Sequence, residues 1–177
     1  MSSGIVFAAL LAGHWIADYW VQTDHQATRK GDTDNAGRRA CAAHAGGVLL
    51  SQLLALLLVA LSTDLGALGA VQLAAGLAVN TVTHYWADRR QTLEGLATAL
   101  GKGGFYARGG APHLDQAWHM GWLLPTALII CAPTAPWALA ATGVCVAVLA
   151  FLDQISRIGC QARHRHGAPT VVLYHRS

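Results

Sequence analysis

Five long apolar stretches restrict what this chain can fold into. They cover residues 4–23, 40–61, 65–87, 113–132 and 136–158. Each has about the 20 helical residues that cross the hydrocarbon core of a bilayer. Only 12% of the 177 residues are charged and 54% are apolar, whereas a soluble domain usually carries about a quarter charged residues. The sequence therefore predicts an all-α integral membrane bundle of about five transmembrane helices.

Lysine and arginine are confined to three parts of the chain. All 12 lie in segments 24–39 and 88–112 or from residue 157 onward. Because these residues favour the cytoplasmic side, the pattern predicts an N-terminus outside and a cytoplasmic C-terminus. Residues 1–158 then form one membrane-embedded domain, and 159–177 a basic cytoplasmic tail. The N-terminus lacks the basic region of a signal peptide, so we expect the first stretch in the mature protein.

The connection 88–112 has a pattern of its own. Leu93, Leu96, Ala97 and Leu100 recur with helical period, which predicts a short interfacial helix over about 91–100. The glycine-rich segment 101–110 lacks the Gly-Lys-Ser/Thr ending of a phosphate-binding loop, and we interpret it as a flexible linker. The net charge of +3 does not favour nucleic-acid binding. The 4 scattered cysteines are typical of small buried side chains.

Histidine and aspartate recur four residues apart in three of the apolar stretches. The pairs are His14 with Asp18, His84 with Asp88 and, in reversed order, Asp115 with His119. Residues four apart share one face of a helix. The fourth stretch runs opposite to the first and third in the predicted topology, so each His lies about 6 Å deeper in the membrane than its Asp. We expect His44 and Asp153 to join this cytoplasmic level from the second and fifth stretches.

These residues are the candidate functional site, because an Asp within a membrane costs about 2.5–3.5 kcal/mol at mid-depth. Imidazole and carboxylate groups are ligands of divalent Zn, Mn and Fe, and helical bundles build such sites from facing helices. We expect the metal ligands to be His14, His44, His84 and His119. Catalytic roles, as further ligands, orienting groups or a general base, fall to Asp18, Asp88 and Asp115. Seven candidates exceed the needs of one ion, so the surplus suits a second metal or a supporting shell.

Two other interpretations of the cluster stay open. In the first, the residues only hold the helices together, with each hydrogen bond contributing about 1 kcal/mol. In the second, they relay protons or ions across the membrane. The second is weakened because the predicted outer half has Asp64 in a turn and little else that ionises.

Aromatic residues gather in the same predicted half of the membrane. They are Trp15, Tyr19, Trp20, Tyr85, Trp86, Trp118 and Trp122, whereas Trp137 marks the outer boundary. An interfacial belt accounts for most of them. Walls of a pocket beside the His/Asp pairs are the alternative.

The polar motifs also carry a family resemblance over about residues 9–132. They read, in order, His14-x3-Asp18 with Gln22-Thr23 after it, His44 early in the next stretch, His84-x3-Asp88-x-Arg90, and Asp115-Gln116-x2-His119. In these motifs the chain resembles a bacterial family of polytopic membrane proteins known as domain-of-unknown-function family 3307. That resemblance implies a multi-pass protein of the bacterial cytoplasmic membrane and supplies no activity.

Taken with a looser likeness to membrane-bound metal-dependent hydrolases, the motifs favour a metal-dependent membrane hydrolase. Its partners would be the lipid bilayer and a lipid-like or membrane-surface substrate. The rival hypothesis is a non-catalytic membrane accessory protein whose polar cluster only fixes helix packing.

Overall fold

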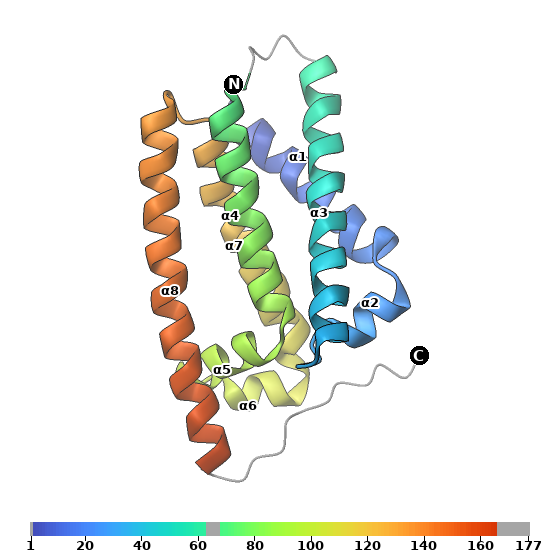
Figure 1. Ribbon diagram of the computed structural model, residues 1–177, viewed down its shortest axis with the longest axis vertical. Helices are drawn as coiled ribbons and strands as arrows, with labels where there is room; N and C mark the ends of the chain where they lie inside the picture. Colours follow the sequence, from blue (N-terminus) through green and yellow to red (C-terminus); the bar gives the residue numbers. More distant parts are fainter. Residues whose placement is uncertain (1, 63–67, 166–177) are drawn as a thin grey trace.

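The computed structural model describes residues 2–62 and 68–165. Within these ranges the chain is built from helices and has no strand, which confirms the all-α class (Figure 1). The long helices are α1 (Ser3–Ile16), α3 (Asn35–Ser62), α4 (Ala70–Asp88), α7 (Ala111–Ile130) and α8 (Ala135–Arg165). Shorter segments connect them: the π-helical turn η1 (Ala17–Val21), α2 (Asp24–Arg29), α5 (Gln91–Ala99), α6 (Gly103–Phe105) and a second π-helical turn, η2 (Tyr106–Gly110).

Three helices of the described chain are long and apolar enough to cross a membrane. They are the α1–η1 helix over Ser3–Val21, α3 and α8. Helices α4 and α7 have 19 and 20 residues but fall outside this set because their His, Asp, Asn and Gln residues lower the mean hydropathy. The three helices indicate a membrane protein. The count of five spans and the orientation stay predictions.

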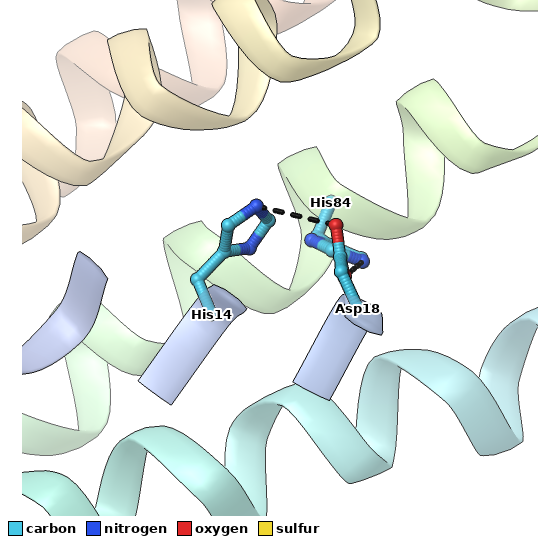
Figure 2. A group of neighbouring side chains, drawn as sticks. All are labelled: His14, Asp18 and His84. Carbon is cyan, nitrogen blue, oxygen red and sulfur yellow. Dashed lines mark ion pairs between the residues drawn. The ribbon is translucent and has the colours of Figure 1, made fainter. Parts of the chain in front are cut away.

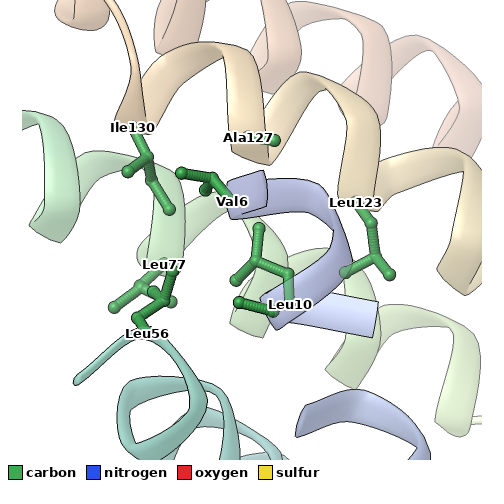
Figure 3. Close-up of a cluster of buried hydrophobic side chains, with 8 residues drawn as sticks. Val6, Leu10, Leu56, Leu77, Leu123, Ala127 and Ile130 are labelled. Carbon is green, nitrogen blue, oxygen red and sulfur yellow. The ribbon is translucent and has the colours of Figure 1, made fainter. Parts of the chain in front are cut away.

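The long helices form a bundle in which α4 contacts α3, α7 and α8, and α1 contacts α3 and α7 (Figure 1). Eight buried apolar residues fill one end of this bundle (Figure 3): Val6, Ala9, Leu10, Leu56, Leu77, Leu123, Ala127 and Ile130. Large apolar residues also cover the outside. Leu58 and Val144, for example, are each 65% exposed. An apolar exterior around a close-packed interior suits lipid as the surrounding solvent.

Helices α1 and α3 approach each other closely beside the candidate site. A Cβ atom at Gly13 would lie 2.7 Å from Gln52 Cα, a contact that real side chains do not make. Glycine thus allows the two backbones to touch, as small residues do in membrane helix pairs. The contact places His14, the next residue along α1, inside the bundle, where it is fully buried.

Two helices extend beyond the predicted spans. Helix α3 begins five residues before residue 40, because the Asp34 side chain accepts a hydrogen bond of 2.7 Å from Gly37 N–H and so caps the helix start. Helix α8 continues into the predicted tail as far as Arg165. Its extension is held by α5, through a 2.7 Å ion pair between Arg163 and Glu94 and a close contact of Gly159 with Gly95.

Other boundaries differ at the start of α4 and in the connection after it. Residues 65–67 of the predicted third span lie outside the described residues, and α4 begins at Ala70. The predicted interfacial helix is α5, but its leucines Leu93 and Leu96 are buried in a core with α8 instead of facing lipid. The glycine-rich segment is not an extended linker. It folds into α6 and η2, with turns made by positive φ angles at Gly101 (72°) and Gly109 (98°).

Candidate metal centre

The structure brings all seven predicted site residues into one buried cluster. They come from four parts of the bundle: His14 and Asp18 from α1 and η1, His44 from α3, His84 and Asp88 from α4, and Asp115 and His119 from α7. Six have side chains exposed by 9% or less, and Asp115 is 29% exposed. The stacked rings of His84 and His119 lie 4.0 Å apart between centroids.

Figure 2 shows how α1 and α4 meet in this cluster. His14 and Asp18 lie one turn apart, and their side chains point towards His84. His14 Nε2 lies 3.3 Å from Asp18 Oδ2, and His84 Nε2 lies 3.8 Å from Asp18 Oδ1. Asp18 belongs to the π-helical turn η1, closed by a 2.8 Å hydrogen bond from Gln22 N–H to Ala17 C=O. Such turns are rare and occur frequently at functional sites.

Four ligand atoms of the cluster gather around the imidazoles of His44 and His84. They are His44 Nε2, His84 Nε2, Asp18 Oδ1 and Asp88 Oδ2. The two imidazole nitrogens lie 3.1 Å apart. Asp88 Oδ2 is 3.3 Å from His44 and 3.1 Å from His84, and Asp18 Oδ1 is 3.4 Å and 3.8 Å from the same nitrogens. A tetrahedron with bonds of about 2.1 Å has edges of about 3.4 Å. The distances among the ligand atoms of His44, His84 and Asp88 are close to this value, so these three residues could hold one ion, and Asp18 is within reach as a further ligand.

A second group contains the remaining oxygen of Asp88. Asp115 Oδ1 lies 3.4 Å from His119 Nε2, and Asp88 Oδ1 lies 4.0 Å from that nitrogen. These three ligand atoms lie close enough together to hold a metal ion, as do those of the groups His14–Asp18–His84 and His44–His84–Asp88. Because Asp115 is the most exposed member, this group is where the cluster opens towards solvent.

Many polar atoms of the cluster lack hydrogen bonds. Within the described chain, buried atoms without a hydrogen-bond partner include His14 Nδ1 and Nε2, Asp18 Oδ1, His84 Nδ1, both carboxylate oxygens of Asp88, and His119 Nε2. The Nε2 atoms of His14 and His119 lie within ion-pair distance of Asp18 and Asp115, but they make no hydrogen bond with them. A buried polar atom without a hydrogen bond is costly. A metal cation bound by the lone pairs of several such atoms would offset that cost.

Two supporting residues were not in the predicted site. Lys30, from the segment after α2, places its Nζ 2.7 Å from Asp88 Oδ1. Gln116 donates a 3.2 Å hydrogen bond from Nε2 to Asp18 Oδ2. Gln116 stands inside the Asp-Gln-x2-His motif, which is a sequence signal for it. Lys30 has no such signal, because its charge is equally explained by the cytoplasmic bias of the connection.

The segment that carries Lys30 is held by arginines at the end of α4. Arg89 Nη1 donates a 2.8 Å hydrogen bond to Lys30 C=O, and Arg90 Nη2 donates one of 2.6 Å to Ala27 C=O. Thr23 and Gln26 form a capping box that starts α2. These bonds position α2 and the following turn beside the cluster.

Two amides form a different kind of polar contact deeper in the bundle. Asn80 Nδ2 donates a 2.8 Å hydrogen bond to Gln52 Oε1, and Gln52 Nε2 donates one of 3.2 Å to Leu10 C=O. These bonds link α1, α3 and α4 and satisfy both amide side chains in part. Helix-to-helix bonding of this kind is what the packing interpretation requires, and it applies to this pair.

Asp153 is not part of the cluster, so the expectation that it joins from the fifth stretch is wrong. Its Oδ1 accepts a 2.9 Å hydrogen bond from Trp86 Nε1, and its Oδ2 pairs with Arg157 Nε at 2.7 Å. Helix α8 packs against α4 and α5. It therefore presents Asp153 to the face of α4 that carries Trp86, whereas His84 and Asp88 face α1 and α3.

The aromatic residues divide into two groups. Trp15, Tyr19 and Trp20 are 49%, 66% and 86% exposed, so they form part of the outer surface, as an interfacial belt requires. Trp86 and Trp118 stack at 4.5 Å between centroids. Neither arrangement makes the aromatic walls of a pocket around the cluster.

Tyr106 adds a buried hydroxyl to the polar side of α5 and η2. Burial raises the pKa of this phenol, and the nearby carboxylates Glu94 and Asp115 raise it further. Tyr106 therefore stays protonated and uncharged at neutral pH.

No family model, no curated protein and no solved structure matches the chain. The resemblance to the family of unknown function stays a prediction. Fold and site define the class instead: a helical protein with three helices long and apolar enough to cross a membrane, and with buried His/Asp groups that could hold a metal ion.

Proposed function

We propose that the protein is a metal-dependent hydrolase of the bacterial cytoplasmic membrane. The observation that carries the proposal is the buried group of His44, His84 and Asp88, whose ligand atoms lie close enough together to hold an ion, with Asp18 beside both imidazoles. Nitrogen and carboxylate donors suit divalent Zn, Mn and Fe. Imidazoles and carboxylates contributed by four different segments make accidental clustering a poor explanation.

Each of the other predicted residues has a place in this proposal. His119 and Asp115 are ligands on the more open side, with Asp115 available as a general base because it reaches solvent. His14 lies 3.3 Å from Asp18 Oδ2 and serves as a ligand or orients that carboxylate. A divalent cation held by these residues would supply an acidified water as the nucleophile for hydrolysis. Asp115 would serve as the base that takes up the proton.

The position of the cluster indicates the kind of substrate. In the predicted topology it lies in the cytoplasmic half of the membrane, near segment 24–34 and the start of α7. A substrate that approaches Asp115 there comes from the membrane surface. We therefore propose a lipid-like or membrane-surface substrate.

A non-catalytic accessory protein is the second candidate, and the ion pair of Lys30 with Asp88 favours it. In that case Lys30 neutralises one buried carboxylate, and the histidines bridge the others. The cluster would then stabilise helix packing alone.

The metal content of the purified protein separates the two candidates. The detergent-solubilised full chain is loaded with Zn or Mn, dialysed and analysed by elemental mass spectrometry. His84→Ala should lose metal, while His113→Ala, an exposed histidine on α7, should retain it. The loaded protein is then incubated with lipid vesicles, and metal-dependent release of headgroups or fatty acids is followed by mass spectrometry. If wild type binds no metal and His84→Ala only lowers the melting temperature, the hydrolase proposal is wrong.

A further inference from the structure

Asp88 faces two different sets of groups with its two carboxylate oxygens. Oδ2 lies 3.3 Å from His44 Nε2 and 3.1 Å from His84 Nε2. Oδ1 lies 4.0 Å from His119 Nε2 and 2.7 Å from Lys30 Nζ. The side chain is 1% exposed, so neither oxygen has water as its main partner. A carboxylate placed in this way can bridge two cations.

The two ligand sets differ in the number of protein ligands, as structural and catalytic metal sites do. On the Oδ2 side, His44 and His84 join Asp88, and Asp18 Oδ1 lies 3.4 Å and 3.8 Å from their Nε2 atoms. Four protein side chains are therefore available there, the number that a closed structural site uses. On the Oδ1 side, only His119 and Asp115 join Asp88. Three protein ligands with an open position are typical of a catalytic ion, and this side contains the exposed Asp115.

The charge of the cluster favours binding of one divalent ion over binding of a second. The cluster has three carboxylates. Its histidines are neutral when they bind a metal, so the other charge in the cluster is the Lys30 ammonium. One divalent ion on the Oδ2 side together with the Lys30 ammonium balances the three carboxylates. A second divalent ion on the Oδ1 side would need Asp88 Oδ1 as a ligand. The Lys30 ammonium already occupies that oxygen, so the two cations would lie next to each other. Two cations so close repel strongly in a site shielded from water.

From these contacts we infer that the centre holds two divalent ions bridged by Asp88, and that Lys30 competes with the second ion for Asp88 Oδ1. This inference rests on the proposed metal function. The closed site with His44 and His84 fills first. The open site with His119 and Asp115 fills only when the lysine side chain moves aside.

Lys30 is suited to this exchange because its side chain can move without its backbone. Its carbonyl is held by Arg89, while its ammonium sits on a flexible four-carbon stem. The side chain is already 12% exposed, so a small rotation brings the charge into solvent. The Gln22 side-chain oxygen also accepts a 3.0 Å hydrogen bond from Lys30 Nζ, so Asp88 is not the sole partner of the ammonium.

The test is a Mn²⁺ titration of the detergent-purified full chain, read by elemental analysis and electron paramagnetic resonance. Wild type should bind two ions of unequal affinity, and the second should give the spectrum of a spin-coupled pair. His44→Ala and Asp115→Asn should each bind one ion, with no coupled spectrum. Lys30→Met should raise the affinity for the second ion by about tenfold or more, because it removes a neighbouring positive charge. Lys102→Met, which removes an exposed lysine elsewhere, should leave both affinities unchanged.

The outcomes separate this inference from the proposed function. If wild type binds one ion and Asp115→Asn binds it equally well, the two-ion centre is wrong and a one-ion enzyme remains. Two ions without spin coupling overturn the Asp88 bridge. An unchanged second affinity in Lys30→Met overturns the competition. Binding of no ion overturns the inference and the metal function together. The number of ions and their spin coupling are measured on wild type, so the test of the Asp88 bridge does not depend on the folding of any variant.

Discussion

At the scale of single residues, Asp88 has the most demanding position in the structure. It is buried, it lies between His84 one turn before it and Lys30 from a distant segment, and neither oxygen has a hydrogen bond within the described chain. Retaining an ionised carboxylate there costs several kcal/mol unless cations surround it. Asp88 is therefore the central ligand of the proposed metal site.

Asp88→Asn tests this explanation. The substitution keeps the volume and removes the charge and one ligand oxygen, so we expect metal affinity to fall by at least about 100-fold, more than supporting residues typically contribute. Isothermal titration of Zn²⁺ into the detergent-solubilised protein measures it. Asp153→Asn, which changes a carboxylate outside the cluster, should bind as wild type does. Equal affinities in the two variants would contradict a ligand role for Asp88.

Gln116 is a positioning residue for Asp18. Its Nε2 donates to Asp18 Oδ2, which leaves Oδ1 facing His44 and His84. Gln116→Ala should weaken metal binding by about 10-fold, at the lower end of the range for such supporting hydrogen bonds. The same metal titration measures the loss. Gln154→Ala, at an exposed position on α8, is the matched control, and a loss of the same size in it would show that the effect is general.

At the scale of helices, close contacts made through glycine determine where the ligands lie. Gly13 allows α1 to touch α3 at Gln52, and Gly95 and Gly159 allow α5 to touch α8. The first contact places His14 and Asp18 opposite His44. The second holds α5 against α8, away from the ligands, so α8 supports the bundle without contributing to the described cluster.

Gly13→Ala should separate α1 from α3. The new methyl group would meet the backbone of Gln52, which cannot rotate away, and overpacking of this kind costs about 1–3 kcal/mol. We expect a lower melting temperature in detergent together with weaker metal binding, because Asp18 moves with α1. Gly46→Ala on α3 is the control, since a Cβ there meets no atom within 4 Å. If both variants melt at the wild-type temperature, the close contact is not needed for stability.

At the scale of the whole molecule, the fold combines a lipid-compatible exterior with a polar centre near one end. The apolar core of Val6, Leu10 and Leu123 occupies the other end. Segments α2, α5 and α6 lie at the same end of the bundle as the end of α4, whereas the turn between α7 and α8 lies at the opposite end (Figure 1). All the lysines and arginines of the described chain belong to the end that carries α2, α5 and α6 or to the last turns of α8.

This distribution yields a topology prediction. Alkaline phosphatase, which needs the disulfides of an oxidising compartment, should be active when fused after Thr134 and inactive when fused after Lys102 or Arg165. Green fluorescent protein fused at the same positions should show the opposite pattern in whole cells. If alkaline phosphatase is active in the fusions after both Lys102 and Thr134, α7 does not cross the membrane and the five-span topology is wrong.

Much of the fold follows from local sequence pattern. Apolar runs of membrane-crossing length predict helices, because a backbone in lipid must satisfy its own hydrogen bonds. A spacing of four residues places His84 above Asp88 on one face, and the charge distribution places the three His/Asp pairs at one depth. Those inferences need only the helical repeat and the direction of each stretch, and they predict that the seven site residues lie together.

The rest was decided by tertiary structure, because a helical repeat determines the face and depth of a residue but not its neighbour. Lys30 reaches Asp88 only because Arg89 and Arg90 hold its segment against α4. Asp153 has a suitable depth, yet α8 packs on the other face of α4 and pairs it with Trp86. The leucines of α5 meet α8 instead of lipid. The sequence alone determined which residues form the candidate metal-binding face of each helix. Helix packing decided which atoms meet there, since distances of about 3 Å across a bundle depend on every contact between the backbones.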